Sequence, residues 1–140
     1  NMKQIYSKVE PDKILHIIHR LQDVVNRKDQ RLDLIEENQF IQCSSLKMQK
    51  GTTFKPHRHI WKSGKQNTIA QESWCVIVGS VKGFFYDLDN TLLHTTNLYV
   101  GDVSFTLEGG HNYEILESNT IVYEYKTGPY EGQTLDKVFI

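Results

Sequence analysis

From residue 39 onward, short apolar runs alternate with turn residues, and this spacing constrains the fold more than any other feature of the sequence. The runs are rich in β-branched and aromatic residues and read as strands. They cover Gln39–Met48, Thr52–Ile60, Ser73–Val78, Val81–Asp87, Thr91–Tyr99, Ser104–Leu107, Tyr113–Leu116 and Thr120–Tyr125. Many short strands at regular spacing predict a sandwich or a small barrel rather than a parallel sheet.

The segment before these runs has a different pattern. Between Glu10 and Lys28 the apolar residues recur at three- and four-residue spacing, as on one face of a helix. Pro11 lies where a first helical turn would begin, and a proline is well tolerated there. We therefore predict a mainly β single domain over 1–140, with an N-terminal helix at 11–27, a β-barrel at 39–126 and a C-terminal tail at 127–140.

Charge and hydropathy narrow the functional classes. The formal net charge is −1 and no basic block is present, so the sequence does not predict a nucleic-acid-binding surface. No apolar stretch approaches the roughly 18 residues of a spanning helix, and we expect no membrane segment. Cys43 and Cys75 lack metal-ligand spacing, so we expect two unpaired thiols and a cytoplasmic location.

Two histidines one residue apart, His57 and His59, are the strongest chemical signal. Residues two apart in a strand share a face, so both imidazoles can bind one metal ion. Glu72 opens an apolar run and His111 follows two glycines, which adds an oxygen and a third nitrogen to the candidate site. The alternative is that His57 and His59 are solvated or hydrogen-bonded without a metal.

Strand alternation identifies further residues that could line a substrate pocket or take part in catalysis. Trp74 shares the face of Glu72, and Tyr113 shares the face of His111, so each is either a wall of a substrate pocket or part of the core. Glu124 is either a catalytic proton acceptor near the metal or the partner of Lys126 or of a neighbouring strand.

Two other histidines, His16 and His19, lie three residues apart in the predicted helix. That spacing would also permit a shared metal. Because the sequence offers no third ligand near them, we place both outside the site.

The histidine pair also belongs to a longer pattern. Gly51, His57-x-His59, Glu72 and Gly79 resemble the first cupin motif, and Gly101, Gly109 and His111 resemble a shortened second cupin motif. Over roughly its last two-thirds the chain also resembles the WbuC-type cupin-fold metalloproteins. The matching pieces are Phe54-Lys-Pro-His-Arg-His59, Glu72 to Gly79, the Phe-Tyr-Asp-Leu-Asp hairpin, and His111 through Val122-Tyr-Glu-Tyr-Lys-Thr-Gly-Pro-Tyr130, with Asp136-Lys137 beyond.

That resemblance implies a cupin double-stranded β-helix, or jelly-roll barrel, in which His57, His59, Glu72 and His111 bind the metal. The interval between His59 and Glu72 is longer than in the first cupin motif, so Gln71 or a water is the alternative oxygen ligand. The resemblance also implies a homodimer and a role in surface-polysaccharide biosynthesis.

Three imidazoles and a carboxylate suit several divalent ions, so iron, manganese, nickel and zinc all remain open. We expect a metal-dependent protein that acts on a small polar metabolite such as a sugar or sugar-nucleotide, as an isomerase or epimerase. The alternatives are an iron-dependent dioxygenase, a non-catalytic cupin that binds a small molecule or a metal, and an interaction module with structural histidines.

Overall fold

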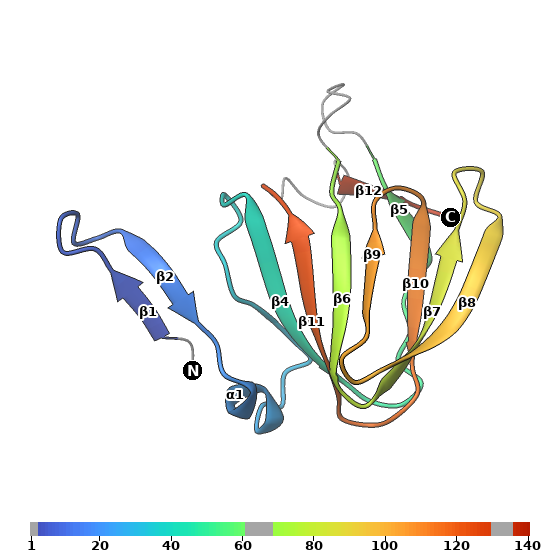
Figure 1. Cartoon of the computed structure of the whole chain (residues 1–140), viewed down its shortest axis with the longest axis horizontal. Helices are drawn as coiled ribbons and strands as arrows, with labels where there is room; N and C mark the ends of the chain where they lie inside the picture. Colours follow the sequence, from blue (N-terminus) through green and yellow to red (C-terminus); the bar gives the residue numbers. More distant parts are fainter. Residues whose placement is uncertain (1–2, 61–68, 130–135) are drawn as a thin grey trace.

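The computed structural model of this chain describes residues 3–60, 69–129 and 136–140. Two five-stranded antiparallel sheets face each other (Figure 1). The first sheet has the order β3-β4-β11-β6-β9, with bounds Arg31–Asp33, Ile41–Met48, Thr120–Thr127, Glu72–Val78 and Val103–Thr106. The second has the order β12-β5-β10-β7-β8, with bounds Lys137–Phe139, His57–His59, Gly110–Ile115, Ser80–Tyr86 and Leu92–Tyr99.

The prediction of a mainly β jelly-roll barrel is confirmed, and each of the eight predicted strands has a counterpart. The run predicted over Thr52–Ile60 is shorter, because only His57–His59 forms the strand β5. Pro56 immediately precedes it and has no N–H group to donate to a neighbouring strand. The segment between His59 and Glu72, expected to be a loop, lies mostly outside the described residues.

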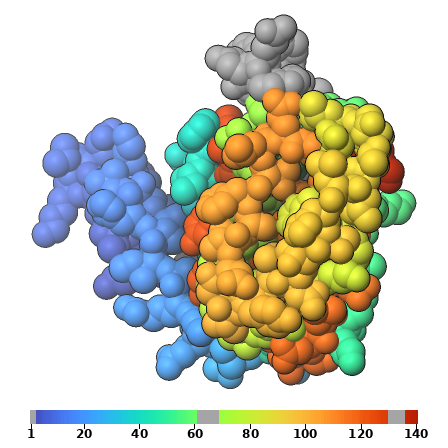
Figure 2. Space-filling model, turned by 45° about the vertical axis from the view of Figure 1, so that its right-hand side comes forward, coloured from blue at the N-terminus to red at the C-terminus, as the bar shows by residue number. Residues whose placement is uncertain are grey.

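The helix predicted at 11–27 is wrong over most of its length. Ile14–Ile18 forms the strand β2, which pairs with β1 (Lys3–Tyr6), and only Leu21–Val25 is helical, as α1. The isoleucines of β2 are β-branched and favour a strand once a partner is present. The β1–β2 pair stands to one side of the barrel (Figure 1; Figure 2). Within the described residues, no helix has the length and apolarity that crossing a membrane requires.

The barrel also extends beyond its predicted limits. The C-terminal tail expected over 127–140 contains β12, which pairs with β5 and places Lys137 opposite His59. At the other end, β3 pairs with β4 and places Arg31 opposite Leu46. Both additions are three-residue strands, too short for a recognisable alternation, and both contribute to the walls of the site described below.

Residues that face the space between the sheets change from apolar to charged along each strand. The register aligns this change across β11 and β6, from Val122 and Val76, through Glu124 and Trp74, to Lys126 and Glu72. The apolar end packs against Val81 and Ile115 of the second sheet in one core cluster. Complete burial of each such side chain contributes about 1.5–3 kcal/mol. The charged end lacks this gain, and a cavity opens there.

Candidate metal centre

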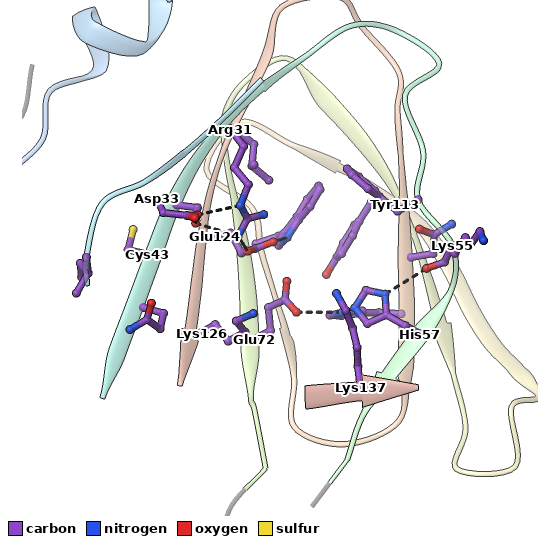
Figure 3. A pocket seen from close by; sticks show the side chains of 18 of the residues that line it. Arg31, Asp33, Cys43, Lys55, His57, Glu72, Tyr113, Glu124, Lys126 and Lys137 are labelled. Carbon is purple, nitrogen blue, oxygen red and sulfur yellow. Dashed lines mark hydrogen bonds and ion pairs between the residues drawn. The ribbon is translucent and has the colours of Figure 1, made fainter. Parts of the chain in front are cut away.

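The four predicted ligands come from three strands that meet at the open end of the barrel. His57 and His59 lie on β5, Glu72 is the first residue of β6, and His111 lies on β10. β5 and β10 are paired with His111 opposite His57, so the two imidazoles are neighbours across the second sheet. Glu72 reaches toward them from the facing sheet (Figure 3).

One potential ligand atom from each of the four side chains lies within 4.8 Å of all the others. Glu72 Oε2 is 2.8 Å from His59 Nε2 and 3.2 Å from His111 Nε2, and Nε2 of His111 is 3.1 Å from Nε2 of His57. His57 is half-buried, whereas the other three are buried. The structure therefore brings together the full set that the sequence suggested, with His57 at the accessible side.

The outer nitrogen of each imidazole has its own partner. Nδ1–H of His57 donates to the carbonyl oxygen of Lys55, and Nδ1–H of His59 donates to Asp136 Oδ2, both over 3.2 Å. Nδ1 of His111 is 2.9 Å from the Thr106 hydroxyl. Because a carbonyl only accepts hydrogen bonds, neutral His57 carries its hydrogen on Nδ1 and presents the Nε2 lone pair inward. His59 contacts a carboxylate at each nitrogen, so both of its N–H groups donate when the ring is protonated.

The protonation of the cluster follows from burial and proximity. Burial and the nearby His111 and Lys137 charges lower the pKa of His57 to about 4. Burial alone would lower the pKa of His59, but hydrogen bonds with Asp136 and Glu72 raise it to about 9. Burial would raise the pKa of Glu72, yet His111 and the histidine hydrogen bonds hold it well below its usual range. Glu72 is therefore ionised at neutral pH.

This donor set fits a divalent metal ion. The Nε2 lone pairs of neutral His57 and His111 would repel each other at 3.1 Å unless a proton or a cation lies between them. Imidazole nitrogen with carboxylate oxygen suits iron, manganese, nickel and zinc. The contacts of His59 with Asp136 and of His111 with Thr106 are the outer hydrogen bonds that orient metal-binding histidines.

A cavity of about 670 Å³ extends from the cluster into the barrel. Trp74 and Tyr113, predicted as either pocket wall or core, are both: each is buried in the core cluster and each lines the cavity. Their rings stack with centroids 3.9 Å apart and planes 5° from parallel. The Tyr113 hydroxyl is 2.8 Å from the hydroxyl of Ser104. The stack gives the cavity a rigid aromatic wall.

Glu124 lines the same cavity but does not pair with Lys126. Arg31 Nη2 donates to one of its carboxylate oxygens over 2.9 Å (Figure 3). Trp74 Nε1 donates to the other, also over 2.9 Å. Burial and the Glu72 carboxylate raise the pKa of Glu124 to about 7. Its charge is therefore balanced between an acidic neighbour that favours protonation and an arginine that opposes it.

Sequence reasoning missed the residues that support the cluster. Arg31 is 93 residues from its partner Glu124 along the chain, and Asp136 is 77 residues from its partner His59. Asp136 is buried and contacts His59, and Lys126 Nζ lies 3.8 Å from Asp136. No local spacing signals such partners; only the strand register of the folded barrel does.

The residues excluded from the site remain separate from it. His16 is exposed on β2, and His19 packs edge-on against Tyr123 with ring centroids 5.8 Å apart. Neither belongs to the cluster of potential metal ligands. Cys43 and Cys75 are free thiols, as expected, and burial raises the pKa of Cys43 to about 11.

Comparison with known sequences finds neither a matching family model nor a matching curated protein. Solved structures are similar. The Cnp3 cupin domain of Schizosaccharomyces pombe is 14% identical, covers 91% of this chain and 85% of its own, and gives a TM-score of 0.59. A protein with a double-stranded β-helix domain from Klebsiella pneumoniae is 15% identical, with 82% and 92% covered and a TM-score of 0.57.

An enzyme is also among the similar structures. Oxalate decarboxylase from Bacillus subtilis is 14% identical over 72% of this chain, with a TM-score of 0.56, and the matched region is 24% of that enzyme. Identities this low concern the fold alone. Taken with the two facing sheets and their register, they lead to one conclusion: this protein has the cupin fold, a double-stranded β-helix.

Proposed function

We propose that this protein is a cupin-fold metalloprotein that holds one divalent ion through His57, His59, Glu72 and His111 and acts on a small polar metabolite. The observation that carries the proposal is the convergence of three imidazoles and one carboxylate within 4.8 Å, beside a cavity of about 670 Å³ that His57, Glu72 and His111 line. A sugar or sugar-nucleotide in surface-polysaccharide biosynthesis is the substrate class that the WbuC resemblance supports.

A bound divalent ion supplies Lewis acidity, which polarises a carbonyl or hydroxyl group and lowers the pKa of bound water. The chain contributes the binding and orientation. The stacked Trp74 and Tyr113 give a flat apolar wall, against which a sugar ring can pack. Burial and Glu72 raise the pKa of Glu124 to about 7, so this group can gain or lose a proton near neutral pH within the same cavity. These features support isomerisation or epimerisation; with iron(II), oxygenation is the alternative chemistry.

One observation favours a second candidate, a cupin that binds its ligand without turnover. Both oxygens of Glu124 already accept hydrogen bonds, from Arg31 and Trp74. A general base must have a lone pair within reach of the proton that it abstracts. Because hydrogen bonds from Arg31 and Trp74 stabilise the charged carboxylate, they lower its tendency to take up a proton, which favours a role for Glu124 in shaping the pocket wall.

The metal content of the purified protein tests the proposal. We expect about one divalent ion per chain in the wild type and a loss of that ion in His57→Ala and in His111→Ala. His94→Ala is the matched control, because His94 is exposed on β8, outside the cluster. Circular dichroism establishes whether each variant folds. A wild-type protein that takes up no metal under any loading condition refutes the proposal.

Proton exchange separates the two candidates. A metal-loaded isomerase or epimerase exchanges a carbon-bound hydrogen of its substrate with deuterium from heavy water, whereas a binder shifts ligand resonances without exchange. Nuclear magnetic resonance of a panel of sugars and sugar-nucleotides detects both results. Exchange that disappears in Glu124→Gln, with metal content unchanged, supports the enzymatic candidate.

A further inference from the structure

Four cationic side chains line the cavity, and two of them already have carboxylate partners. Arg31 lies 2.9 Å from both Asp33 Oδ1 and Glu124 Oε1. Lys126 Nζ lies 3.8 Å from Asp136 Oδ2. The remaining two are Lys55 and Lys137. Among the described residues, Lys55 and Lys137 are therefore the cationic side chains of the lining that have no carboxylate within ion-pair distance.

Of these two lysines, Lys137 lies closer to the candidate metal ligands in the strand register. It lies on β12, which pairs with β5 and sets Lys137 opposite His59. Its side chain runs from β12 toward the space beside His57 and Glu72 (Figure 3). The residue is half-buried, and its charge contributes to the lowered pKa of His57. Among the described residues, Lys137 has no ion pair.

Lys55 adds charge at the rim. It is exposed, and its Nζ lies 5.8 Å from the centroid of the Phe139 ring. Phe139 itself pairs with His57 across β12 and β5. Lys55 and Lys137 thus flank the half-buried imidazole of the cluster, which is the ligand most accessible from the cavity.

The cavity is also lined by acidic and amide side chains, and Arg31 lies among them, paired with Asp33 and Glu124. Asp33, Glu37, Gln42 and Glu124 line it, and their side chains present acceptor oxygens. Carboxylate and amide oxygens accept hydrogen bonds from hydroxyl groups. A ligand that complements both sets of side chains carries an anionic group at one end and hydroxyl groups along the rest of its length.

We propose that the ligand of this cavity is a polyhydroxy carboxylate, a sugar acid, whose carboxylate pairs with Lys137 beside the metal ligands and whose hydroxyls face the acidic wall. The inference rests on the proposed metal centre, because a carboxylate next to the ion is attracted by both charges. Within the described part of the cavity wall, the one guanidinium is already paired with carboxylates, and phosphate recognition commonly relies on an available guanidinium fork or a helix N-terminus.

The test measures binding of three probes to the metal-loaded full chain by calorimetry: gluconate, the neutral polyol glucitol and inorganic phosphate. Gluconate and glucitol have the same carbon chain and differ in the carboxylate. We expect gluconate to bind at least about tenfold more tightly than glucitol, and more tightly than phosphate. Binding of gluconate is also expected to weaken as ionic strength rises.

Substitutions at Lys137 test whether this lysine pairs with the carboxylate of gluconate. Lys137→Met removes the charge at similar length, and we expect about tenfold weaker gluconate binding with unchanged metal content. Lys137→Arg keeps the charge and should retain most of the affinity. Lys50→Met is the matched control, because Lys50 is exposed and does not line the cavity; it should bind gluconate as the wild type does.

The outcomes distinguish the two proposals. Absence of metal from the wild type, measured before any probe is added, overturns the metal centre itself. With metal present, three results overturn the sugar-acid assignment and leave the metal centre intact: gluconate binding no better than glucitol, phosphate binding more tightly than gluconate, or unchanged affinity in Lys137→Met.

Discussion

Nε2 of His57 lies 3.1 Å from Nε2 of His111, on neighbouring antiparallel strands of one sheet. Hydrogen bonding of His57 Nδ1–H to the Lys55 carbonyl leaves the Nε2 of the neutral ring without a hydrogen. Two nitrogens at this separation are stable when a proton or a cation lies between them. A hydrogen on His111 Nε2 bridges the pair in the absence of metal, and an ion bound by both nitrogens would take its place, with Glu72 supplying the compensating negative charge.

Asp136 should control metal affinity although it is not a predicted ligand. Asp136→Asn keeps the size of the side chain but weakens the acceptor for His59 Nδ1–H. We expect metal affinity to fall about 10–100-fold, the usual effect of losing such an orienting contact. Competition with a chelator measures it. Asp12→Asn, at an exposed position, should leave the affinity unchanged; equal losses in both variants would contradict the assigned role.

Metal binding should release protons in a defined pH range. His59 has a pKa raised to about 9, so it is protonated at pH 7.5, whereas His57, with a pKa lowered to about 4, is neutral. A metal ion must displace the His59 proton. We therefore expect about one proton released per ion at pH 7.5, and affinity that falls about tenfold per pH unit below pH 9.

Calorimetry in buffers with different ionisation enthalpies counts the released protons. In the protein without added metal, the raised pKa of His59 stabilises the folded state in a pH-dependent way. Because its folded pKa is raised, this stabilisation is complete below about pH 6.5, the unfolded pKa, and is lost as the pH rises through about 9. Absence of proton release at pH 7.5 would contradict the hydrogen-bonding scheme of His59.

Arg31 and Glu124 should be strongly coupled in stability. Arg31→Met leaves the buried Glu124 carboxylate without its cation. Because the Arg31 side chain is 46% exposed and solvent screens the pair, we expect its loss to cost about 1–2 kcal/mol. We expect this loss in the free energy of unfolding at pH 8, where Glu124 would otherwise be ionised. Arg31→Met with Glu124→Gln should recover most of it. Denaturant unfolding measures both, with exposed Arg20→Met expected within about 0.5 kcal/mol of wild type.

Gly109 should be required for the placement of His111. Its φ is +90°, and a Cβ there would lie 2.5 Å from the Tyr86 carbonyl oxygen, so Gly109→Ala must move the backbone two residues before His111. We expect a loss of about 2–4 kcal/mol in stability and at least tenfold in metal affinity. Gly51→Ala is the control, because its φ is +88° but its Cβ would meet nothing within 4 Å.

For Gly51→Ala we expect the free energy of unfolding to fall by about 1–2 kcal/mol, because alanine is strained in the left-handed backbone conformation. We expect the metal affinity of this variant to be unchanged. The comparison separates backbone strain from displacement of the ligand. Equal effects of the two substitutions on metal affinity would show that the close approach to Tyr86 has no role in positioning His111.

The four clustered side chains were accessible to sequence reasoning because strand periodicity is local. His57 and His59 share a face by the period of two, and the same rule placed Trp74 beside Glu72 and Tyr113 beside His111. Cross-strand partners do not follow from that rule. Arg31 reaches Glu124 and Asp136 reaches His59 only through the register of β3 with β4 and of β12 with β5.

In the N-terminal segment, local periodicity gave the wrong secondary structure. Ile14, Ile17 and Ile18 satisfy helical spacing, but a run of five residues is too short for periodicity to distinguish a helix from a strand. Pairing with Lys3–Tyr6 decides the outcome, and that partner segment contains only one apolar β-branched residue, Ile5. Backbone pairing between two weakly patterned segments overrides the local signal.

Anomalous diffraction from crystals of the zinc-loaded protein locates the bound ion. We predict one anomalous peak per chain, about 2.0–2.2 Å from Nε2 of His57, His59 and His111 and from a Glu72 carboxylate oxygen. A fully loaded protein whose zinc lies elsewhere, or is bound without His111, would contradict this prediction.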